Sequence, residues 1–283
     1  MTDASSPAPA RDAASLVLLR DGDAGVEVYM VRRHGRSRFM ANAHVFPGGR
    51  LDEADCAPDL VDRCAGLDGQ QAARCMGLDD PDRARGLYVA ALRETFEEAG
   101  VLLARPPPAA TRLTAQREQL NAGELSFAAM LQQQSLTLAL DQLRYLDHWI
   151  TPEFEPRRYD ARFFVGRAPA GQAASHDPVE TSAGQWSTVP ALLEGNRLQD
   201  LFLAPPTLVI LEGLADFASV DEALAAAPNH PVPSTTPRPL MGKDVRELTL
   251  MFPGDRCYED PSRTEGPLNR AVLRDGAFVH LEG

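Results

Sequence analysis

The order of hydrophobic and polar residues predicts one long amphipathic helix, which begins near Gly86 and ends at Gly100. Glycine is favoured just past a helix end, so Gly100 marks the stop. At about 100° per residue, one side of this helix gathers the apolar side chains Val89, Leu92, Phe96 and Ala99. The opposite side carries three carboxylates within an arc of about 100°, those of Glu94, Glu97 and Glu98. One face is therefore expected to be buried, while the other presents acidic groups within a single turn.

Shorter stretches with strand character predict a sheet. Residues 15–20 and 26–33 form one expected hairpin, joined by a turn at 21–25. A second hairpin is expected at 271–274 and 277–281, because the Asp275-Gly276 pair between them favours a tight turn. Further strands are expected at residues 43–46, 149–151, 160–167, 185–187 and 245–252.

Segments with helical character alternate with these strands. They lie at residues 60–64, 70–76, 111–134, 136–145, 189–195 and 205–227, the last of which is expected to break near Asp216-Phe217. The mixture of helices and strands predicts a fold of the α+β class.

The length of 283 residues suits one large domain with additions. Residues 1–14 are small and polar and include prolines, so a disordered tail is expected there. The main domain is expected to span residues 15–227. Because residues 228–239 contain five prolines, residues 228–283 are predicted to form a proline-rich linker and a C-terminal β extension packed on the same domain.

The composition narrows the function classes. The net charge of −12 disfavours nucleic acid as a partner, because a phosphate backbone requires a basic surface. No apolar run of 18 residues or more occurs and the first residues lack an apolar core, so no membrane association is expected and the cytoplasm is the expected location. If this acidic protein binds an anionic substrate, a metal ion and a few arginines must supply positive charge locally.

The acidic face of the long helix has two interpretations. Surface helices are rich in glutamate, so a pair of glutamates alone is most often a solvated face. Three clustered carboxylates repel one another, however, and a divalent cation would remove that cost. Hard oxygen ligands of this kind suit Mg²⁺ or Mn²⁺.

A second motif decides between these interpretations. The stretch from Phe46 to Asp55 reads Phe-Pro-Gly-Gly-Arg-Leu-Asp-Glu-Ala-Asp, and residues 93–101 read Arg-Glu-Thr-Phe-Glu-Glu-Ala-Gly-Val. Together they resemble the signature of the Nudix hydrolase family, G-x5-E-x7-R-E-U-x-E-E-x-G-U, where U is aliphatic. Asp55 stands where the family has Glu, and Thr95 stands where it prefers an aliphatic residue. Between Asp55 and Arg93 lie 37 residues instead of seven, so residues 56–85 are interpreted as a helical insertion inside the motif.

An interrupted signature of this kind resembles one branch of the family, the peroxisomal acyl-coenzyme A diphosphatases and their bacterial relatives. The resemblance extends to residues 38–49, 149–164, 202–219 and 252–255. It implies an α/β/α sandwich with a mixed sheet, and hydrolysis of coenzyme A or acyl-coenzyme A to 3′,5′-ADP and a 4′-phosphopantetheine. Two alternatives stay open: a pyrophosphatase acting on ADP-ribose or on a dinucleotide such as NADH, and a non-catalytic nucleotide-binding sensor.

The resemblance also implies roles for individual residues. Glu94 and Glu98 are the expected metal pair, and Glu97 is either a third ligand or the base that positions water. The carbonyl of Gly49 is the expected backbone ligand for Mg²⁺ or Mn²⁺. Arg93 is expected to pair with Glu97 and to fix its conformation. Glu180 is the candidate for a distal catalytic base, with a surface role as the alternative.

Substrate contacts are expected from arginines and one aromatic residue. The candidates are Arg32, Arg38, Phe39, Arg157 and Arg158. Because Arg32 and Arg33 are neighbours on a strand, at most one of them can face the site. A small-molecule nucleotide is thus the expected partner, and a homodimer is compatible with the sequence.

Overall fold

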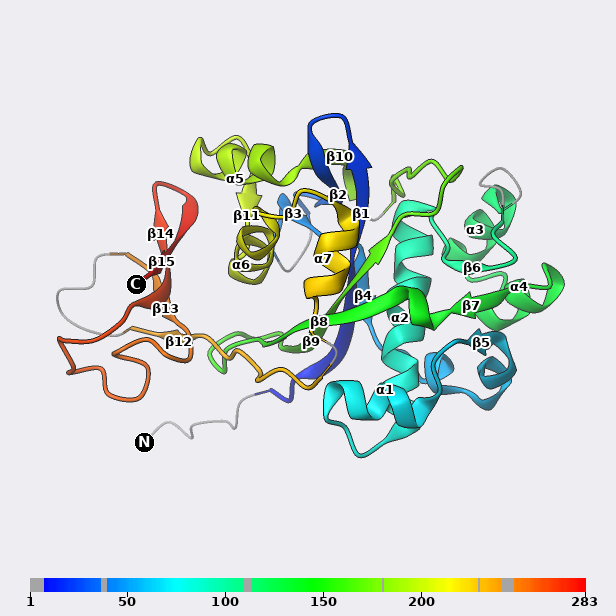
Figure 1. The fold of residues 1–283 in the computed structure, drawn as a ribbon, viewed down its shortest axis with the longest axis horizontal. Helices are drawn as coiled ribbons and strands as arrows, with labels where there is room; N and C mark the ends of the chain where they lie inside the picture. The colour runs from blue at the N-terminus through cyan, green and yellow to red at the C-terminus, as the bar shows by residue number, and fades with distance from the viewer. Residues whose placement is uncertain (1–7, 37–39, 109–112, 180, 229, 241–246) are drawn as a thin grey trace.

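The computed structural model of the chain describes residues 8–283 except 37–39, 109–112, 180, 229 and 241–246. Its centre is a mixed sheet with eight strands in the described part of the chain (Figure 1). The main path runs β11 (Phe202–Leu203), β3 (Ala43–Val45), β2 (Gly25–Arg33), β1 (Arg11–Gly22), β9 (Tyr159–Arg167) and β8 (Leu143–Ile150). Two more strands join it, since β10 (Thr181–Thr188) pairs with β2 and β4 (Gly48–Arg50) pairs with β1. Strand β1 is parallel to β9 and antiparallel to β2, and the expected first hairpin is confirmed.

Helices cover both faces of this sheet, which confirms the expected α/β/α sandwich (Figure 1). Alternate residues of β1 point to opposite faces. Leu16 and Leu18 join the core under α2 (Pro81–Ala99). Val17 and Leu19 join a second core, which is closed by α5 (Val189–Arg197), α6 (Pro205–Leu214) and α7 (Val220–Ala226). The expected break in the 205–227 helix therefore falls between α6 and α7.

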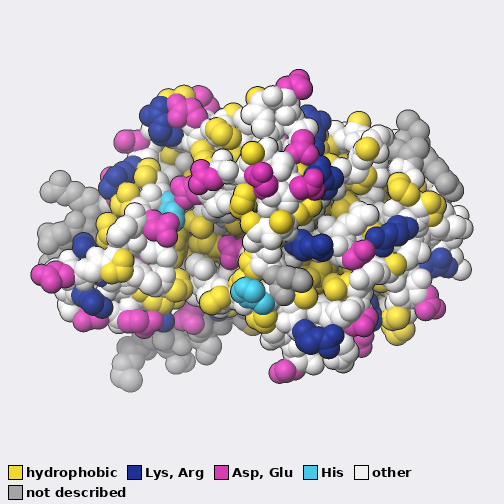
Figure 2. Space-filling view, viewed as in Figure 1, with side chains coloured by type: hydrophobic (Ala, Val, Ile, Leu, Met, Phe, Trp, Pro, Cys, Tyr) yellow, Lys and Arg dark blue, Asp and Glu magenta, His cyan; other side chains and the backbone are white. Residues whose placement is uncertain are grey.

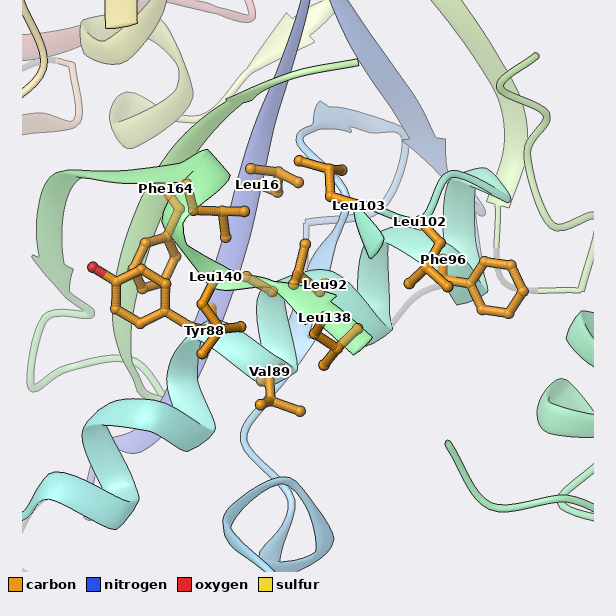
Figure 3. Close-up of a cluster of buried hydrophobic side chains, with 14 of the residues drawn as sticks. Leu16, Tyr88, Val89, Leu92, Phe96, Leu102, Leu103, Leu138, Leu140 and Phe164 are labelled. Carbon is orange, nitrogen blue, oxygen red and sulfur yellow. The ribbon is translucent and has the colours of Figure 1, made fainter. Parts of the chain in front are cut away.

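Helix α2 is the element around which the first core is built. Figure 3 shows Tyr88 of this helix beside Phe164 of β9, and Val89 below Leu138. Phe96 lies at the edge of the same cluster, next to Leu102. The helix begins at Pro81 rather than near Gly86, because the Asp80 side chain caps its first turn and proline fits the first helical position. It ends where Gly100 adopts the left-handed conformation, at φ 69°.

The insertion packs against α2 as a compact unit. It follows the 3₁₀ helix η1 (Glu53–Cys56), which ends the first half of the motif. It contains a second 3₁₀ helix, η2 (Pro58–Arg63), the strand β5 (Cys64–Ala65) and the helix α1 (Gly69–Met76). Leu60, Ala72 and Met76 are buried in the same core as α2. Strand β5 also joins β7 (Thr137–Ala139) and β6 (Ala104–Arg105) in a small sheet, so the insertion is tied to the segment that follows α2.

Three expectations were wrong. Residues 136–145 form β7, the short 3₁₀ helix η4 (Leu140–Gln142) and the start of β8, instead of a helix. Leu136, Leu138 and Leu140 alternate with a period of two, and long-range pairing to β5, β6 and β9 overrides the local helical pattern. Residues 111–134 contain two helices, α3 (Thr114–Asn121) and α4 (Phe127–Gln133), because Gly123 interrupts them at φ 72°. Residues 11–14, expected in the tail, belong to β1.

The C-terminal residues form a second sheet of β12 (Arg238–Pro239), β13 (Thr249–Met251), β14 (Asn269–Arg274) and β15 (Ala277–Glu282). The expected hairpin around Asp275-Gly276 is confirmed. This sheet contributes Leu250, Phe252 and Phe278 to the second core, so it packs on the main domain. None of the helices in the described ranges is long and apolar enough to span a membrane.

Candidate active site

The last turns of α2 place the three glutamates against the glycine turn. The backbone N–H of Gly48 donates to Glu98 Oε2 at 3.0 Å, and only 7% of the Glu98 surface is exposed. A Cβ at position 49 would overlap the carboxylate of Glu94, so glycine lets that carboxylate approach the turn and any side chain there would displace it. The insertion therefore leaves the two halves of the motif in contact, as the sequence predicts.

The pairing of β4 with β1 decides which backbone groups face the glutamates. Leu51 N–H donates to Asp12 and Leu16 N–H donates to Pro47, so these two positions are hydrogen-bonded ladder pairs. Along an antiparallel ladder, hydrogen-bonded pairs alternate with pairs that are not hydrogen-bonded, so every second pair is of the first kind. Ala14 and Gly49 form the hydrogen-bonded pair that lies between the two just named. The polar backbone groups of Gly49 therefore face β1, whereas those of Gly48 face α2. The carbonyl on the carboxylate side thus belongs to Gly48, instead of to Gly49 as expected.

Arg93 organises the carboxylates. Its guanidinium forms a two-point ion pair with Asp55, with Nε to Oδ1 at 2.8 Å and Nη2 to Oδ2 at 2.9 Å. Its Nη1 donates to both Glu94 Oε1 and Glu97 Oε2 at 2.9 Å. Although burial opposes its charge, the hydrogen bonds to Asp55 and the nearby carboxylates raise the pKa of Arg93. The expected contact with Glu97 is present, and the shorter Asp55 reaches the arginine.

A cleft of about 770 Å³ runs from these carboxylates across the sheet to the C-terminal sheet. Its acidic end is lined by Asp52, Glu94, Glu97, Glu98 and Asp177. Its far end is lined by Trp149, Phe202, Leu250, Leu273 and Phe278. Figure 2 shows hydrophobic side chains in the hollow between the C-terminal sheet and the rest of the molecule. One continuous cavity therefore joins a charged end to an apolar end.

Positive charge reaches this cleft from arginines other than those expected. Arg33 and Arg50 line it, and no hydrogen-bond partner lies within reach of the buried Arg33 Nε in the described part of the chain. Arg32 is exposed, approaches Asn42 and does not line the cleft, so Arg33 is the member of that pair that faces the site. Arg157 and Arg158 also lie outside the lining. The Arg158 side chain is instead held by the carbonyls of Thr151 and Ala8.

The donors at the acidic end suit a hard divalent cation. Carboxylate oxygens and a backbone carbonyl are the ligands that Mg²⁺ and Mn²⁺ prefer. Arg93 engages one oxygen each of Glu94 and Glu97, so these two groups are held by the guanidinium. In the described part of the chain, no three His, Cys, Asp or Glu side chains form a ready-made metal centre. The donor chemistry thus fits the metal, although the ligands are not gathered around one point.

Comparison with known proteins identifies the family. The family described as NUDT19 Nudix domain matches residues 81–214, which include α2 and the cleft-lining strands β8, β9 and β11. Acyl-coenzyme A diphosphatase NUDT19 from Xenopus laevis is 26% identical, over 84% of this chain and 73% of the relative. The protein of the same name from Gallus gallus is 28% identical, over 86% of this chain and 76% of the relative.

A solved structure supports the same family assignment as the family model and the relatives. The crystal structure of a Nudix hydrolase from Alicyclobacillus acidocaldarius is 29% identical, covers 79% of this chain and 99% of its own, and superposes with a TM-score of 0.65. This chain belongs to the Nudix hydrolase family. It is a diphosphatase of the interrupted-motif branch, which the sequence resemblance predicted.

The remaining expected site residues of this Nudix hydrolase lie outside the described residues. They are Arg38, Phe39 and Glu180. The structure adds Asp177, which sequence reasoning missed. Asp177 is 8% exposed, lines the cleft, and its N–H donates to the Glu98 carbonyl. No motif spacing singles it out, because the loop reaches the end of α2 only through tertiary packing.

Proposed function

We propose that this Nudix hydrolase cleaves the diphosphate linkage of coenzyme A or an acyl-coenzyme A. The products are 3′,5′-ADP and 4′-phosphopantetheine or its acyl derivative. The observation that carries this proposal is the single cleft that joins the carboxylates of α2 to two arginines and to an apolar end. The names of the relatives from Xenopus laevis and Gallus gallus support the same substrate class.

Glu94, Glu97, Glu98 and the carbonyl of Gly48 would hold Mg²⁺ or Mn²⁺. The ion would offset the negative charge of the diphosphate and lower the pKa of a bound water, so that the water could lose a proton and attack phosphorus. The chain positions these ligands in advance. Arg93 fixes Glu94 and Glu97, and the Gly48 N–H fixes Glu98. Side chains held in this way lose little conformational freedom when the substrate binds.

Two residues are candidates for the base that takes the proton from water. Glu97 is the more exposed of the two glutamates that contact Arg93, with 23% of its side chain exposed against 14% for Glu94. Asp177 approaches the same end of the cleft from a different loop. The substitutions Glu97→Gln and Asp177→Asn distinguish the two candidates. Only the substitution that removes the base should change the acidic limb of the pH profile of kcat.

Arg33 and Arg50 supply positive charge to the substrate phosphates. Both line the cleft, and no carboxylate is recorded within ion-pair distance of either among the described residues. Arg33 also carries the buried Nε that has no hydrogen-bond partner among the described residues. A phosphate oxygen would satisfy that donor through a charge-assisted hydrogen bond.

The proposal is tested by hydrolysis of coenzyme A, octanoyl-coenzyme A, ADP-ribose and NADH with Mg²⁺ or Mn²⁺, followed by chromatography of the products. We expect the two coenzyme A compounds to give the highest kcat/KM. Glu98→Gln should lower kcat at least about a hundredfold, because a metal ligand acts mainly in the transition state. Glu118→Gln, an exposed change on α3 outside the cleft, is the matched control and should retain activity.

Other outcomes favour the alternatives. Preferred turnover of ADP-ribose or NADH would assign the same chemistry to another nucleoside diphosphate. Binding without turnover of any of the four compounds would indicate a sensor.

A further inference from the structure

We propose that the C-terminal sheet and the start of α6 form the binding site for the acyl group of an acyl-coenzyme A substrate. This inference rests on the proposed function and deepens it. It assigns the apolar end of the cleft to the acyl chain, so that chain length becomes the property that this part of the protein selects.

The first observation is the distribution of charge along the cleft. Ten described residues from Phe202 onward line it, and none of them carries a charge. Only Thr207 has a polar side chain. The acidic end, in contrast, combines carboxylates with Arg33, Arg50 and Arg93. Among the described residues, the lining of the C-terminal end offers a diphosphate or a 3′-phosphate no cationic side chain to contact, whereas a hydrocarbon chain requires none.

The start of α6 strengthens this argument. The N-terminus of a helix normally attracts anions through its unpaired N–H groups. Here the first two helical residues are Pro205 and Pro206, which have no N–H to donate, and both line the cleft. Two of the N–H groups that a helix start normally offers are therefore replaced by proline rings, which makes this end of the helix a weaker site for a phosphate.

The second observation is the position of the exposed hydrophobic side chains. The described residues include seven large hydrophobic side chains that are at least 36% exposed. Four of them line this one cleft, and they are Met40, Phe154, Val179 and Leu248. They come from four distant parts of the sequence, so neighbouring positions in the chain do not explain the clustering. Apolar side chains gathered around one cavity mark a site for an apolar ligand.

The floor of this end is already formed by the fold. Trp149, Leu250 and Phe278 are 4%, 7% and 6% exposed, and belong to the second core. Two anchors keep the C-terminal sheet in place, since Asn196 donates to the Phe278 carbonyl at 2.9 Å and His280 contacts Glu212 at 2.7 Å. An acyl chain would therefore enter a preformed surface and would not need to order it.

The experiment compares coenzyme A with its acetyl, butyryl and octanoyl thioesters. Each buried methylene contributes about 0.8 kcal/mol, which is about fourfold in affinity. Incomplete burial reduces this factor, so we expect octanoyl-coenzyme A to bind at least about tenfold more tightly than coenzyme A. Calorimetry with the Glu98→Gln variant measures this while turnover is reduced at least about a hundredfold. The heat capacity change should become more negative as the chain lengthens.

Two variants test the site itself. Leu248→Asn and Phe154→Ser change side chains that are 45% and 51% exposed, so the fold should survive. Each should reduce the ratio of kcat/KM for octanoyl-coenzyme A over coenzyme A several-fold, and the pair together at least about tenfold. Leu198→Asn is the matched control, because Leu198 is 53% exposed but does not line the cleft. It should leave the ratio unchanged.

The outcomes separate this inference from the proposed function. If coenzyme A is cleaved but affinity does not depend on chain length, the assignment of the apolar end is wrong and the proposed function stands. The same holds if Leu248→Asn lowers turnover of both substrates equally. If neither compound is cleaved while ADP-ribose is, the proposed function fails and this inference fails with it.

Discussion

The ion pair between Asp55 and Arg93 makes the sharpest quantitative prediction, because it joins the two halves of an interrupted motif. Asp55 is 1% exposed and Arg93 is 8% exposed, and two charge-assisted hydrogen bonds connect them. The change Asp55→Asn keeps the shape of the side chain and removes its charge. An amide also turns one acceptor into a donor group that faces the guanidinium.

The magnitude follows from these contacts. Removing one partner of a buried ion pair costs about 3–5 kcal/mol when the other charge is left uncompensated. Arg93 retains Glu94, Glu97 and the Arg50 carbonyl, so its charge is still balanced after the change. We therefore expect Asp55→Asn to lower the free energy of unfolding by about 2–3 kcal/mol, which is in the range for losing hydrogen bonds to charged groups.

The assay is urea unfolding followed by tryptophan fluorescence, with kcat/KM measured on the same samples. Asp52→Asn is the matched control, because Asp52 Oδ2 lies 3.7 Å from the same guanidinium with 60% of its side chain exposed. An exposed pair contributes less than about 1 kcal/mol, so this variant should unfold almost as the wild type does. Equal stabilities of Asp55→Asn, Asp52→Asn and wild type would refute the view that the buried pair holds the motif together.

Three further predictions concern the glycine turn, the cleft and the C-terminal sheet. Gly49→Ala should displace the Glu94 carboxylate and lower kcat at least about a hundredfold. Gly213→Ala is the control and should be neutral, because an added Cβ there meets no atom within 4 Å. Full activity of Gly49→Ala would disprove the close approach of Glu94 to the turn. Arg33→Ala should raise KM about tenfold by removing a phosphate contact, while Arg32→Ala should change it less than about twofold, and the reverse order would exclude Arg33 as the phosphate ligand. Burial opposes the charge of Asp255, but hydrogen bonds from Arg270 and two backbone N–H groups lower its pKa in the folded state below the ordinary 3.8. Asp255 therefore binds its proton more tightly in the unfolded chain, so the stabilisation from its ionised form is present above about pH 4 and is lost as the pH falls. The free energy of unfolding, measured from pH 6 to pH 3, should decline less steeply in Asp255→Asn than in the wild type. Parallel curves for the two proteins would contradict the lowered pKa of Asp255.

The insertion shows why a broken motif can still assemble. The entropy of closing a loop grows only with the logarithm of its length, so about thirty extra residues cost little. Here the insertion also contributes apolar side chains, including Leu60 and Met76, to the core under α2. The ends of the loop are then fastened by the Asp55–Arg93 pair. Motif residues far apart in sequence are thus held together by packing and by one buried ion pair.

Local sequence determined much of this protein. The spacing of Glu94, Glu97 and Glu98 along a helix follows from 3.6 residues per turn, and the Asp275-Gly276 turn follows from the backbone freedom of its residues. The family signature then connected the glycine turn with this helix. Each of these inferences depends on residues that are neighbours in the chain or share a known motif.

Tertiary structure alone decided the rest. Residues 136–145 form β7 and the start of β8 on either side of a short 3₁₀ helix, because the partner strands β5, β6 and β9 lie elsewhere in the chain, and no local pattern contains that pairing. Arg33 rather than Arg32 reaches the cleft because of which face of β2 borders it. The carbonyl of Gly48 rather than that of Gly49 faces the glutamates because of the register of β4 against β1. The cleft is lined by side chains spread from Ala13 to Phe278. Their chemistry is visible in the sequence, but their meeting in one cavity is a product of long-range packing, which local residue order does not encode.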